Sequence, residues 1–362
     1  MSEPPEPSSG PEAHPEPSVA APPAEGPPVE GASDVELLEK AAAASGALHD
    51  AIGERVIGQR EVIELMLVAL LSRGHALLVG VPGLAKTLLV SSLAEALGLR
   101  FGRVQFTPDL LPADITGTDV LHEEEGPTGD VRRRVRFLPG PIFHNLILAD
   151  EINRTPPKTQ AALLQAMQER RVTVGTTTHR LPDPFQVFAT RNPIEQEGTY
   201  PLPEAQLDRF LLEIHIDYPS EIEEREVARR TTSAHVGEVP CVLSADEVRA
   251  LQALIPRIPV TDAAVELAVA LGRATRPKSV DAKTPAMVRE YVRFGAGPRG
   301  SQALVLAAKA RAALLGQAAA DIDDVRAMVI PVLRHRLVLS YRAEAEGVRD
   351  VDILAKIQDS VR

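Results

Sequence analysis

An eight-residue glycine-containing loop constrains the fold of this chain more than any other feature. The loop reads Gly80-Val81-Pro82-Gly83-Leu84-Ala85-Lys86-Thr87. It follows a short apolar run, 76–79, that predicts a buried strand, and it precedes a helical pattern over 88–97. Between a strand and a helix, such a loop presents backbone N–H groups and a helix N-terminus that attract phosphate. Lys86 adds a positive charge near the β- and γ-phosphates of a nucleotide, and Thr87 offers a hydroxyl to Mg²⁺.

Residue 85 departs from the usual G-x-x-x-x-G-K-[ST] pattern of phosphate loops, because it is alanine where the pattern has glycine. Glycine is needed where φ is positive or where a Cβ would strike the phosphate. Alanine is tolerated at this position if residue 85 already has helical φ and ψ angles.

A second apolar run, 146–149, ends in the carboxylates of Asp150 and Glu151. An acidic pair at a strand end is by itself a common solvated feature. After a phosphate loop, however, it is the form expected of a Walker B strand. We therefore expect Asp150 to hold Mg²⁺, directly or through water, and Glu151 to orient and deprotonate the attacking water.

Two further side chains fit the same site. Asn192 leaves the end of a predicted strand, 186–189, and is a hydrogen-bond partner for the γ-phosphate or the water; alone, an asparagine before proline indicates a turn. Arg209 stands just before a predicted strand, 213–216, where an isolated arginine is ordinarily a surface ion-pair residue.

The segment from 50 to 218 alternates between short apolar runs and helical periods. Strands are predicted over 76–79, 103–106, 146–149, 186–189 and 213–216, and helices over 62–71, 88–97 and 159–169. Short apolar strands separated by helices predict an α/β fold whose parallel sheet is covered on both faces.

After residue 219 the pattern changes, and from Ser244 onward only helical periods occur. Helices are predicted over 221–232, from a capping box at Ser244 and Glu247, and over 261–275, 286–294, 301–315 and 322–338. Thr284 is the expected N-cap of the helix over 286–294, with Pro285 at its first position. The second part is therefore expected to be an all-helical domain of about 120 residues.

The composition excludes several classes of protein. The 362 residues suffice for two domains, and an apolar content of 44% excludes disorder of the whole chain. A net charge of −11 and 3% aromatic residues without tryptophan argue against nucleic acid as a partner. One cysteine, Cys241, excludes an internal disulfide. There is no apolar run of ~18 residues and no secretory signal pattern, so we expect no membrane span and a cytoplasmic location.

The first 34 residues contain ten prolines, seven carboxylates and no lysine or arginine. Such a segment cannot bury enough apolar area to offset its ordering entropy. We expect residues 1–34 to be a disordered acidic tail, which either has no role or docks a partner. The expected domains are then a nucleotide-binding α/β domain over 35–220 and a helical domain over 221–362.

Several phrases of the sequence resemble the AAA+ ATPases and, within them, the MoxR family. They lie at 80–87, 105–112, 149–154, 163–169, 202–210, 297–300 and 332–336. The resemblance covers about residues 50–340 and implies a nucleotide-binding α/β domain followed by a helical lid. The alanine at position 85 is similar to the MoxR form of the loop, whereas Arg191 stands where the family pattern has glutamine.

The resemblance implies the nucleotide site in detail. Lys86 and Thr87 correspond to Walker A, Asp150 and Glu151 to Walker B, and Asn192 to sensor 1. The residues implied to contact ATP are Ile57, Gly58, Gly80, Val81, Pro82, Gly83, Leu84, Ala85, Lys86, Thr87 and Leu88. The implied cofactors are ATP and Mg²⁺, with Thr87 and Asp150 as metal ligands.

Two arginines are implied to complete the site. Arg209 resembles an arginine finger that inserts into a neighbouring subunit, so the resemblance implies a homo-oligomeric ring, most commonly a hexamer. Arg299, at the start of a lid helix, resembles sensor 2, which reaches the phosphates of its own subunit.

Two insertions also fit the resemblance. An irregular stretch between 111 and 143 is similar to a helix-2 insert, and its arginine run, 132–136, is either a solvated hairpin face or a contact with a threaded substrate or neighbouring subunit. Residues 171–181, two β-rich runs about Gly175, resemble the hairpin before sensor 1 or an ordinary surface hairpin.

The leading interpretation is an Mg²⁺-ATP-dependent ATPase that remodels or matures client proteins. The resemblance implies a partner with a von Willebrand factor A domain. The alternative is a nucleic-acid-associated AAA+ motor or transcription activator, which DNA-stimulated hydrolysis would reveal. A third reading is a scaffold that binds ATP and scarcely hydrolyses it, supported by Ala85 and Arg191 and opposed by the retention of Lys86, Asp150 and Glu151.

Overall fold

The computed structural model of the chain describes residues 33–361, except 126–130, 196–197, 233–236 and 280–283. Its centre is a five-stranded sheet in the order β2-β5-β8-β1-β9, with every neighbouring pair parallel. The strands are β1 (His75–Val79), β2 (Phe101–Gln105), β5 (Leu146–Asp150), β8 (Gln186–Arg191) and β9 (Phe210–His215). All five predicted strands are present, with ends that differ by at most three residues.

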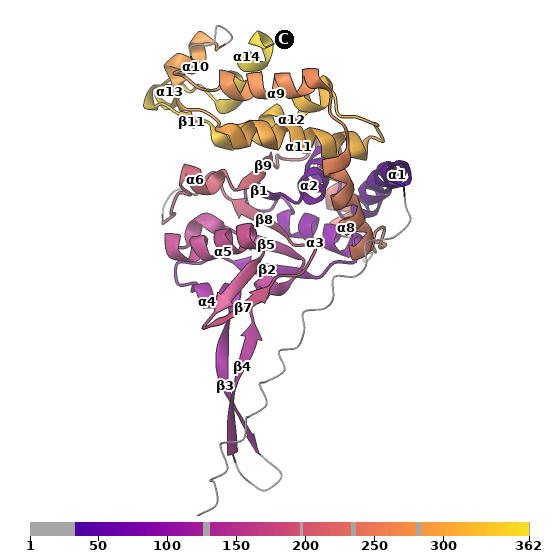
Figure 1. Ribbon diagram of the computed structural model, residues 1–362, viewed down its shortest axis with the longest axis vertical. Coiled ribbons are helices and arrows are strands. Elements are labelled where there is room, and N and C mark those ends of the chain that lie inside the picture. The colour runs from indigo at the N-terminus through magenta and orange to yellow at the C-terminus, as the bar shows by residue number, and fades with distance from the viewer. Residues whose placement is uncertain (1–32, 126–130, 196–197, 233–236, 280–283, 362) are drawn as a thin grey trace, which may run out of the picture.

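Helices cover both faces of this sheet (Figure 1). One face packs against α2 (Arg60–Leu71) and α3 (Lys86–Ala96), and α1 (Asp34–Gly53) and α8 (Ala245–Leu254) pack on these helices. The opposite face packs against α4 (Pro112–Thr116), η1 (Pro141–Phe143) and α5 (Pro157–Glu169). Because both faces are covered, the inner strands are mostly apolar and every residue of β1 is buried, whereas the edge strand β2 alternates buried and exposed residues. The expected α/β architecture is confirmed.

The N-terminal helix corrects the expected extent of the acidic tail. Residues 1–32 lie outside the described part of the chain, but Ser33 and Asp34, which we assigned to the tail, begin α1. The Ser33 hydroxyl accepts a hydrogen bond from the Glu36 N–H (3.2 Å), and the Glu36 carboxylate accepts one from the Ser33 N–H (2.7 Å). This capping box satisfies backbone donors that a helix start otherwise leaves unpaired.

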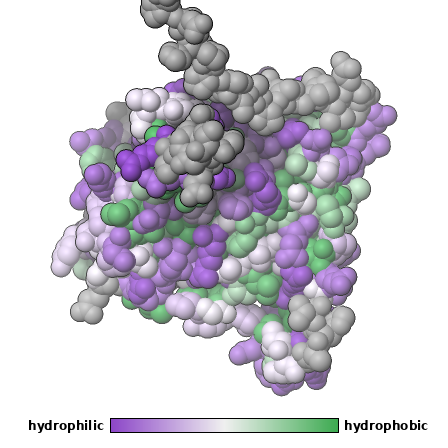
Figure 2. Space-filling view, turned by 90° about the horizontal axis from the view of Figure 1, so that it is seen from below, coloured by the Kyte–Doolittle hydropathy of each residue, from purple (hydrophilic) through white to green (hydrophobic). Residues whose placement is uncertain are grey.

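The stretch between 111 and 143 is not irregular. It contains a long antiparallel hairpin, β3 (Gly117–Glu125) and β4 (Val131–Pro139), that extends away from the sheet (Figure 1). Leu121 faces Val135 across the two strands, and Glu123 pairs with Arg133 (2.8 Å). The face of the molecule seen from this end carries hydrophilic and hydrophobic residues interspersed (Figure 2). The arginines whose burial is described in this run are exposed, as expected of a solvated hairpin face.

A second hairpin, β6 (Arg171–Val174) and β7 (Thr177–Arg180), turns at Gly175, as predicted. It is joined to the long hairpin by two rings. Phe137 of β4 stacks on His179 of β7 with ring centroids 3.9 Å apart. The two hairpins therefore touch through a specific contact near the base of the longer one.

The second part of the chain is mainly helical. It contains α7 (Glu221–Thr231), η3 (Ile255–Arg257), α9 (Asp262–Ala274), α10 (Ala286–Tyr291), α11 (Pro298–Leu314), α12 (Ile322–Leu333), η4 (Arg334–Arg336), α13 (Tyr341–Glu346) and α14 (Asp350–Ser360). The alanine-rich α11 packs between α9 and α12 on one side and α1 and α2 on the other, in a core continuous with that of the sheet. No helix among the described residues is long and apolar enough to cross a bilayer.

The expectation of helices alone after Ser244 is wrong in one place. Residues 292–294 form β10 (Val292–Phe294), which pairs antiparallel with β11 (Val338–Leu339). The predicted helix over 286–294 therefore ends at Tyr291, and the predicted helix over 322–338 ends at Leu333. Short apolar runs have no period that separates strand from helix, so the pattern extended both helices too far.

Helix starts in this part also differ from the prediction. Pro285, with ψ of 150°, is itself the N-cap of α10, so Thr284 does not cap this helix. The buried hydroxyl of Thr284 has no hydrogen-bond partner in the described structure. Conversely, α11 begins at Pro298, three residues earlier than predicted, with Gly297 as N-cap. Arg299 consequently lies in the first turn of α11, as expected from the sequence.

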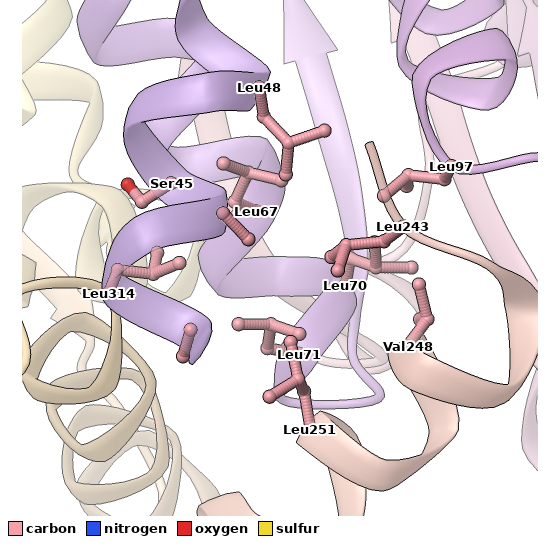
Figure 3. A pocket seen from close by; sticks show the side chains of 12 residues that line it. Ser45, Leu48, Leu67, Leu70, Leu71, Leu97, Leu243, Val248, Leu251 and Leu314 are labelled. Atoms are coloured by element: carbon pink, nitrogen blue, oxygen red, sulfur yellow. The ribbon is translucent and has the colours of Figure 1, made fainter. Parts of the chain in front are cut away.

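A small apolar cavity of about 10 Å³ lies where α1, α2, α8 and α11 meet (Figure 3). Leucines surround it, among them Leu48, Leu67, Leu251 and Leu314. It has space for one water molecule at most and almost no polar lining, so it is a packing defect rather than a ligand site.

Arg336, in the helical part of the chain, forms hydrogen bonds with residues at the start of β9. Its side chain is buried; Nε donates to Asp208 Oδ1 (2.9 Å), Nη2 to the Phe210 carbonyl (2.8 Å) and Nη1 to the Leu211 carbonyl (3.1 Å). A guanidinium satisfies several acceptors at once because its donors form a planar fork.

We expect the substitution Arg336→Met to lower the free energy of unfolding by about 3 kcal/mol, since it removes a buried guanidinium together with its hydrogen bonds to a carboxylate and two carbonyl groups. Arg342→Met is the matched control, because Arg342 pairs with Glu290 and Glu346 on the surface and should change stability by less than about 1 kcal/mol. Urea unfolding measures both. Equal, small effects would show that Arg336 does not hold the two parts together.

Candidate functional site

The predicted phosphate loop connects the end of β1 to the start of α3. Gly80 is required by close packing, because a Cβ there would lie 2.7 Å from the carbonyl oxygen of Ile216. Gly83 and Ala85 both have positive φ, of 89° and 54°. Ala85 therefore does not have the helical angles under which alanine would be tolerated freely. It holds a left-handed conformation, which costs an L-residue roughly 1–2 kcal/mol relative to the right-handed one.

Lys86 begins α3 and folds back over the loop. Its Nζ donates to the carbonyl oxygens of Gly80 (2.6 Å) and Val81 (2.9 Å). Burial is the main influence on the Lys86 pKa and lowers it, whereas the nearby carboxylates of Asp150 and Glu151 raise it. The Lys86 ammonium and the carboxylates of Asp150 and Glu151 thus share one electrostatic environment.

Asp150 ends β5 and has a partner on each side. Its Oδ1 accepts a hydrogen bond from the Thr190 hydroxyl (2.6 Å), and its Oδ2 pairs with Arg103 Nη2 (2.7 Å). The same Thr190 hydroxyl accepts the Glu151 N–H (2.8 Å), so Thr190 fixes both positions of the acidic pair. Thr190 and Arg103 come from β8 and β2, the two strands that flank β5.

Glu151 follows the strand in a left-handed conformation, with φ of 57°. Its Oε2 accepts a hydrogen bond from Gln105 Nε2 (2.8 Å) and lies 3.2 Å from Arg154 Nη1. Positive φ is uncommon for a side chain of this size, and such strain concentrates at functional sites. The backbone conformation turns Glu151 out of the strand, where Gln105 and Arg154 hold its carboxylate.

Asn192 lies immediately after β8, beside the start of the loop. The Arg191 carbonyl accepts the Gly80 N–H (3.3 Å), which ties the two strand ends together. Asn192 is buried; its Oδ1 accepts the Ile194 N–H (3.2 Å), while its Nδ2 has no hydrogen-bond partner in the described structure. A buried amide donor ordinarily has a partner, and a phosphate oxygen or a water at this strand end would supply one. The residues present therefore fit a bound nucleotide.

The segment predicted to flank the adenine lies at the exit of β9. Gly58 has a φ of 71°, and a Cβ at this position would collide with the Glu223 carboxylate. The neighbouring Gln59 donates from Nε2 to the Asp217 carbonyl (3.1 Å). Gly58 and Gln59, which follow Ile57, thus lie against α7 and the connection that leads to it from β9, at the same edge of the sheet as the phosphate loop.

The two predicted arginines lie near each other at the opposite end of the parallel strands, where the strands begin. Arg299 Nη1 is 3.7 Å from Asp208 Oδ2, directly beside Arg209. Phe210 starts β9 opposite His75, whereas the phosphate loop starts five residues later along the parallel β1, about 17 Å away. The expectation that Arg299 reaches the phosphates of its own subunit does not fit this placement, because an arginine side chain cannot span that distance.

Sequence reasoning missed a buried carboxylate between the two edges. The Glu213 carboxylate on β9 is hydrogen-bonded to His215 Nε2 (2.8 Å). It also forms ion pairs with Arg334 Nε (3.4 Å) and Arg191 Nη2 (3.7 Å). Arg191, the departure from the family pattern noted above, is therefore used here as an ion-pair partner. Burial alone would raise the Glu213 pKa, but the His215 hydrogen bond and the surrounding positive charges hold it at about 2.

The low pKa of Glu213 predicts a contribution to stability that depends on pH. Because the folded-state pKa is below the ordinary value of about 4.5, ionised Glu213 stabilises the fold above that pH, and the stabilisation is lost as pH falls toward 2. The difference in unfolding free energy between the unmodified protein and Glu213→Gln should therefore be largest above pH 5 and shrink on acidification. Urea titrations at pH 6, 4 and 3 measure it, and a difference that stays constant would contradict the assignment.

Arg103, Gln105 and Thr190 were also missed as site residues. Each is a polar side chain on a strand of the central sheet, and the register places Gln105 opposite Asp150. Polar residues in otherwise apolar strands were the available signal. The strand order, which brings β2 and β8 to either side of β5, is what gives these residues a common location.

Comparison with known proteins agrees with this geometry. A model of the "ATPase family associated with various cellular activities (AAA)" matches residues 75–212, and a model of the AAA lid domain matches residues 285–357. Chaperone MoxR1 of Mycobacterium tuberculosis is 41% identical over 346 residues, which are 94% of this chain and 87% of that protein. This chain belongs to the MoxR family of AAA ATPases. The resemblance stated from the sequence is thereby confirmed.

Two further relatives support the MoxR assignment and the fold. The uncharacterized protein YeaC of Bacillus subtilis is 40% identical over 87% of this chain and 95% of its own length. A crystal structure from Cytophaga hutchinsonii, of a protein designated only as a candidate ATPase, matches with a TM-score of 0.79 and 39% identity. That match covers 90% of this chain and 97% of the other, so the α/β domain and the helical lid are both part of the shared fold.

Proposed function

We propose that this MoxR-family protein hydrolyses ATP with Mg²⁺ and uses the energy to remodel or mature client proteins. The observation that carries the proposal is the convergence of Lys86, the acidic pair and the unpaired Asn192 amide at one edge of the sheet. A cation, two carboxylates and a free donor match the charges of a phosphate chain, a metal and an attacking water.

The residues divide the work of hydrolysis. Bound ATP and Mg²⁺ supply the phosphoanhydride and a divalent charge on its oxygens. The loop N–H groups and Lys86 hold the phosphates, and Thr87 and Asp150 would hold the metal. Glu151 would take a proton from the attacking water, and Asn192 Nδ2 would donate to that water or to the γ-phosphate. All of these groups lie at the ends of adjacent parallel strands or on the loop between them.

The placement of the two arginines supports a homo-oligomeric ring, and a hexamer is the ring size that the family resemblance implies. Arg209 has no ion pair within the described part of the chain, and neither it nor Arg299 reaches the phosphate loop of the same subunit. We propose that both act on the nucleotide of a neighbouring subunit. The name of the mycobacterial relative, a chaperone, supports a protein client. A partner with a von Willebrand factor A domain rests on the family resemblance alone.

The proposal is tested by assaying the purified full chain for phosphate release from ATP, with Mg²⁺ and with excess EDTA. Hydrolysis that requires Mg²⁺ and rises in specific activity with protein concentration supports a ring ATPase. Binding of ATP without turnover would favour the scaffold instead. Stimulation by DNA would favour the nucleic-acid motor, against which the net charge of −11 argues.

A further inference from the structure

Arg103 stands in direct contact with the carboxylate that would face the metal. It lies on β2, and its Nη2 is 2.7 Å from Asp150 Oδ2. The Asp150 side chain is 13% exposed, whereas that of Arg103 is 49% exposed. The contact therefore joins a largely buried carboxylate to a guanidinium that has room to move toward solvent.

The neighbours of Asp150 leave its charge already balanced. Thr190 donates to Oδ1, and the Arg103 guanidinium carries a full positive charge at Oδ2. A carboxylate retains lone pairs after two such contacts, so a metal is not excluded by the number of donors. A second cation at the same carboxylate is nevertheless disfavoured, because like charges repel and each must share the anion.

We propose that Arg103 competes with the magnesium ion for Asp150 and so sets the affinity of the nucleotide site for the metal. The inference rests on the proposed function, because it requires Asp150 to be a metal ligand. A half-exposed ion pair contributes little to folding, so stability alone gives no reason for a guanidinium at this position. Its consequence lies in the charge that it places beside Asp150.

The contacts of Arg103 extend beyond Asp150. The same Nη2 donates to Gln105 Oε1 (2.8 Å), and Gln105 Nε2 in turn donates to Glu151 Oε2 (2.8 Å). Asp150 and Glu151 are therefore linked through two side chains of β2. A change in the position of Arg103 would therefore also affect Gln105, the residue that holds the carboxylate of Glu151.

The test compares nucleotide affinity with and without metal. The dissociation constant of ADP is measured by titration calorimetry in Mg²⁺ and in EDTA. The value in EDTA divided by the value in Mg²⁺ gives the contribution of the metal to nucleotide affinity. The substitution Arg103→Met should raise this ratio by about three- to tenfold, the size expected for removing one partly exposed competing charge. Arg103→Lys, which keeps the charge but loses the planar fork, should give an intermediate ratio.

Two controls isolate the contact with Asp150. Arg100→Met removes the same charge three residues earlier, where the guanidinium donates to the Phe143 carbonyl, and should leave the ratio within about twofold. In an Asp150→Asn background, Arg103→Met should no longer change the ratio. Thermal melting establishes that each variant is folded, and Arg103→Lys serves if the methionine variant is not.

The outcomes separate this inference from the proposed function. A ratio that is unchanged or lower in Arg103→Met overturns the competition, as does an effect that persists with Asp150→Asn. If the unmodified protein binds no nucleotide, or binds it equally well in EDTA, the proposed Mg²⁺-nucleotide site itself fails.

Discussion

Replacing Glu151 by glutamine should leave ATP binding intact and slow hydrolysis by roughly 10²–10⁴-fold, the usual size of a general-base contribution. The amide keeps the shape of the side chain and its contacts with Gln105 and Arg154 but cannot accept a proton. Replacing Lys86 by alanine should abolish binding, because it removes the cation over the phosphate loop. Calorimetric binding of ATP and single-turnover phosphate release measure the two effects separately.

Glu195→Gln is the matched control for the loss of a charge near the site. Glu195 pairs with Arg154 (3.1 Å), the same arginine that contacts Glu151, but it lies in the segment after β8 rather than at the end of β5. Its substitution should change turnover by less than about threefold, as expected for a partly exposed ion pair. Equal loss of ATP binding in Lys86→Ala and Glu151→Gln would contradict the division of roles. The Glu151→Gln variant should also remain bound to its client, because it binds ATP without hydrolysing it. It is therefore the variant to use for identifying clients.

The positions of the loop at 80–87 and of the acidic pair could be predicted because their sequence signals are local. Each is a short phrase at the end of an apolar run, and a buried parallel strand is apolar whatever its neighbours are. Lys86, Asp150 and Glu151 therefore needed no knowledge of the strand order. The structure places them as the sequence suggested, in one electrostatic environment.

Residues whose role depends on the strand order could not be found in the same way. Arg103 and Thr190 lie 47 and 40 residues from Asp150 in the chain, and only the order β2-β5-β8 brings them together. The left-handed angle of Ala85 was missed for a different reason. Alanine gives no sign of positive φ, so the surrounding loop rather than the residue imposes that conformation.

The first helix shows a signal that was present and overlooked. Leu37, Ala41, Ala44 and Leu48 are buried at helical spacing in α1. Because the preceding residues are rich in proline, the expected end of the tail was placed at residue 34, which lies beyond the Ser33 N-cap. The short pair β10 and β11 gave no such signal, because each strand has only two apolar residues, which fit either period.

Replacing Arg209 by alanine should leave nucleotide binding nearly normal and reduce hydrolysis by about 10³–10⁵-fold, the size reported for an arginine that stabilises charge on a transferring phosphoryl group. Arg299→Ala should slow hydrolysis of the same nucleotide, because the ion pair with Asp208 places Arg299 beside Arg209. If both arginines serve the neighbouring subunit, each site takes Lys86 from one subunit and both arginines from the next.

Mixing inactive variants distinguishes this arrangement from one in which Arg299 serves its own subunit. Arg209→Ala or Arg299→Ala mixed with Lys86→Ala should regain part of the activity, because some sites then join an intact loop to two intact arginines. Arg209→Ala mixed with Arg299→Ala should stay inactive, because no subunit then supplies both. An Arg299 that acted within its own subunit would give the reverse result for the two mixtures that contain its variant. Activity per subunit that stays constant on dilution to monomers, with no rescue in any mixture, would mean that neither arginine acts across an interface.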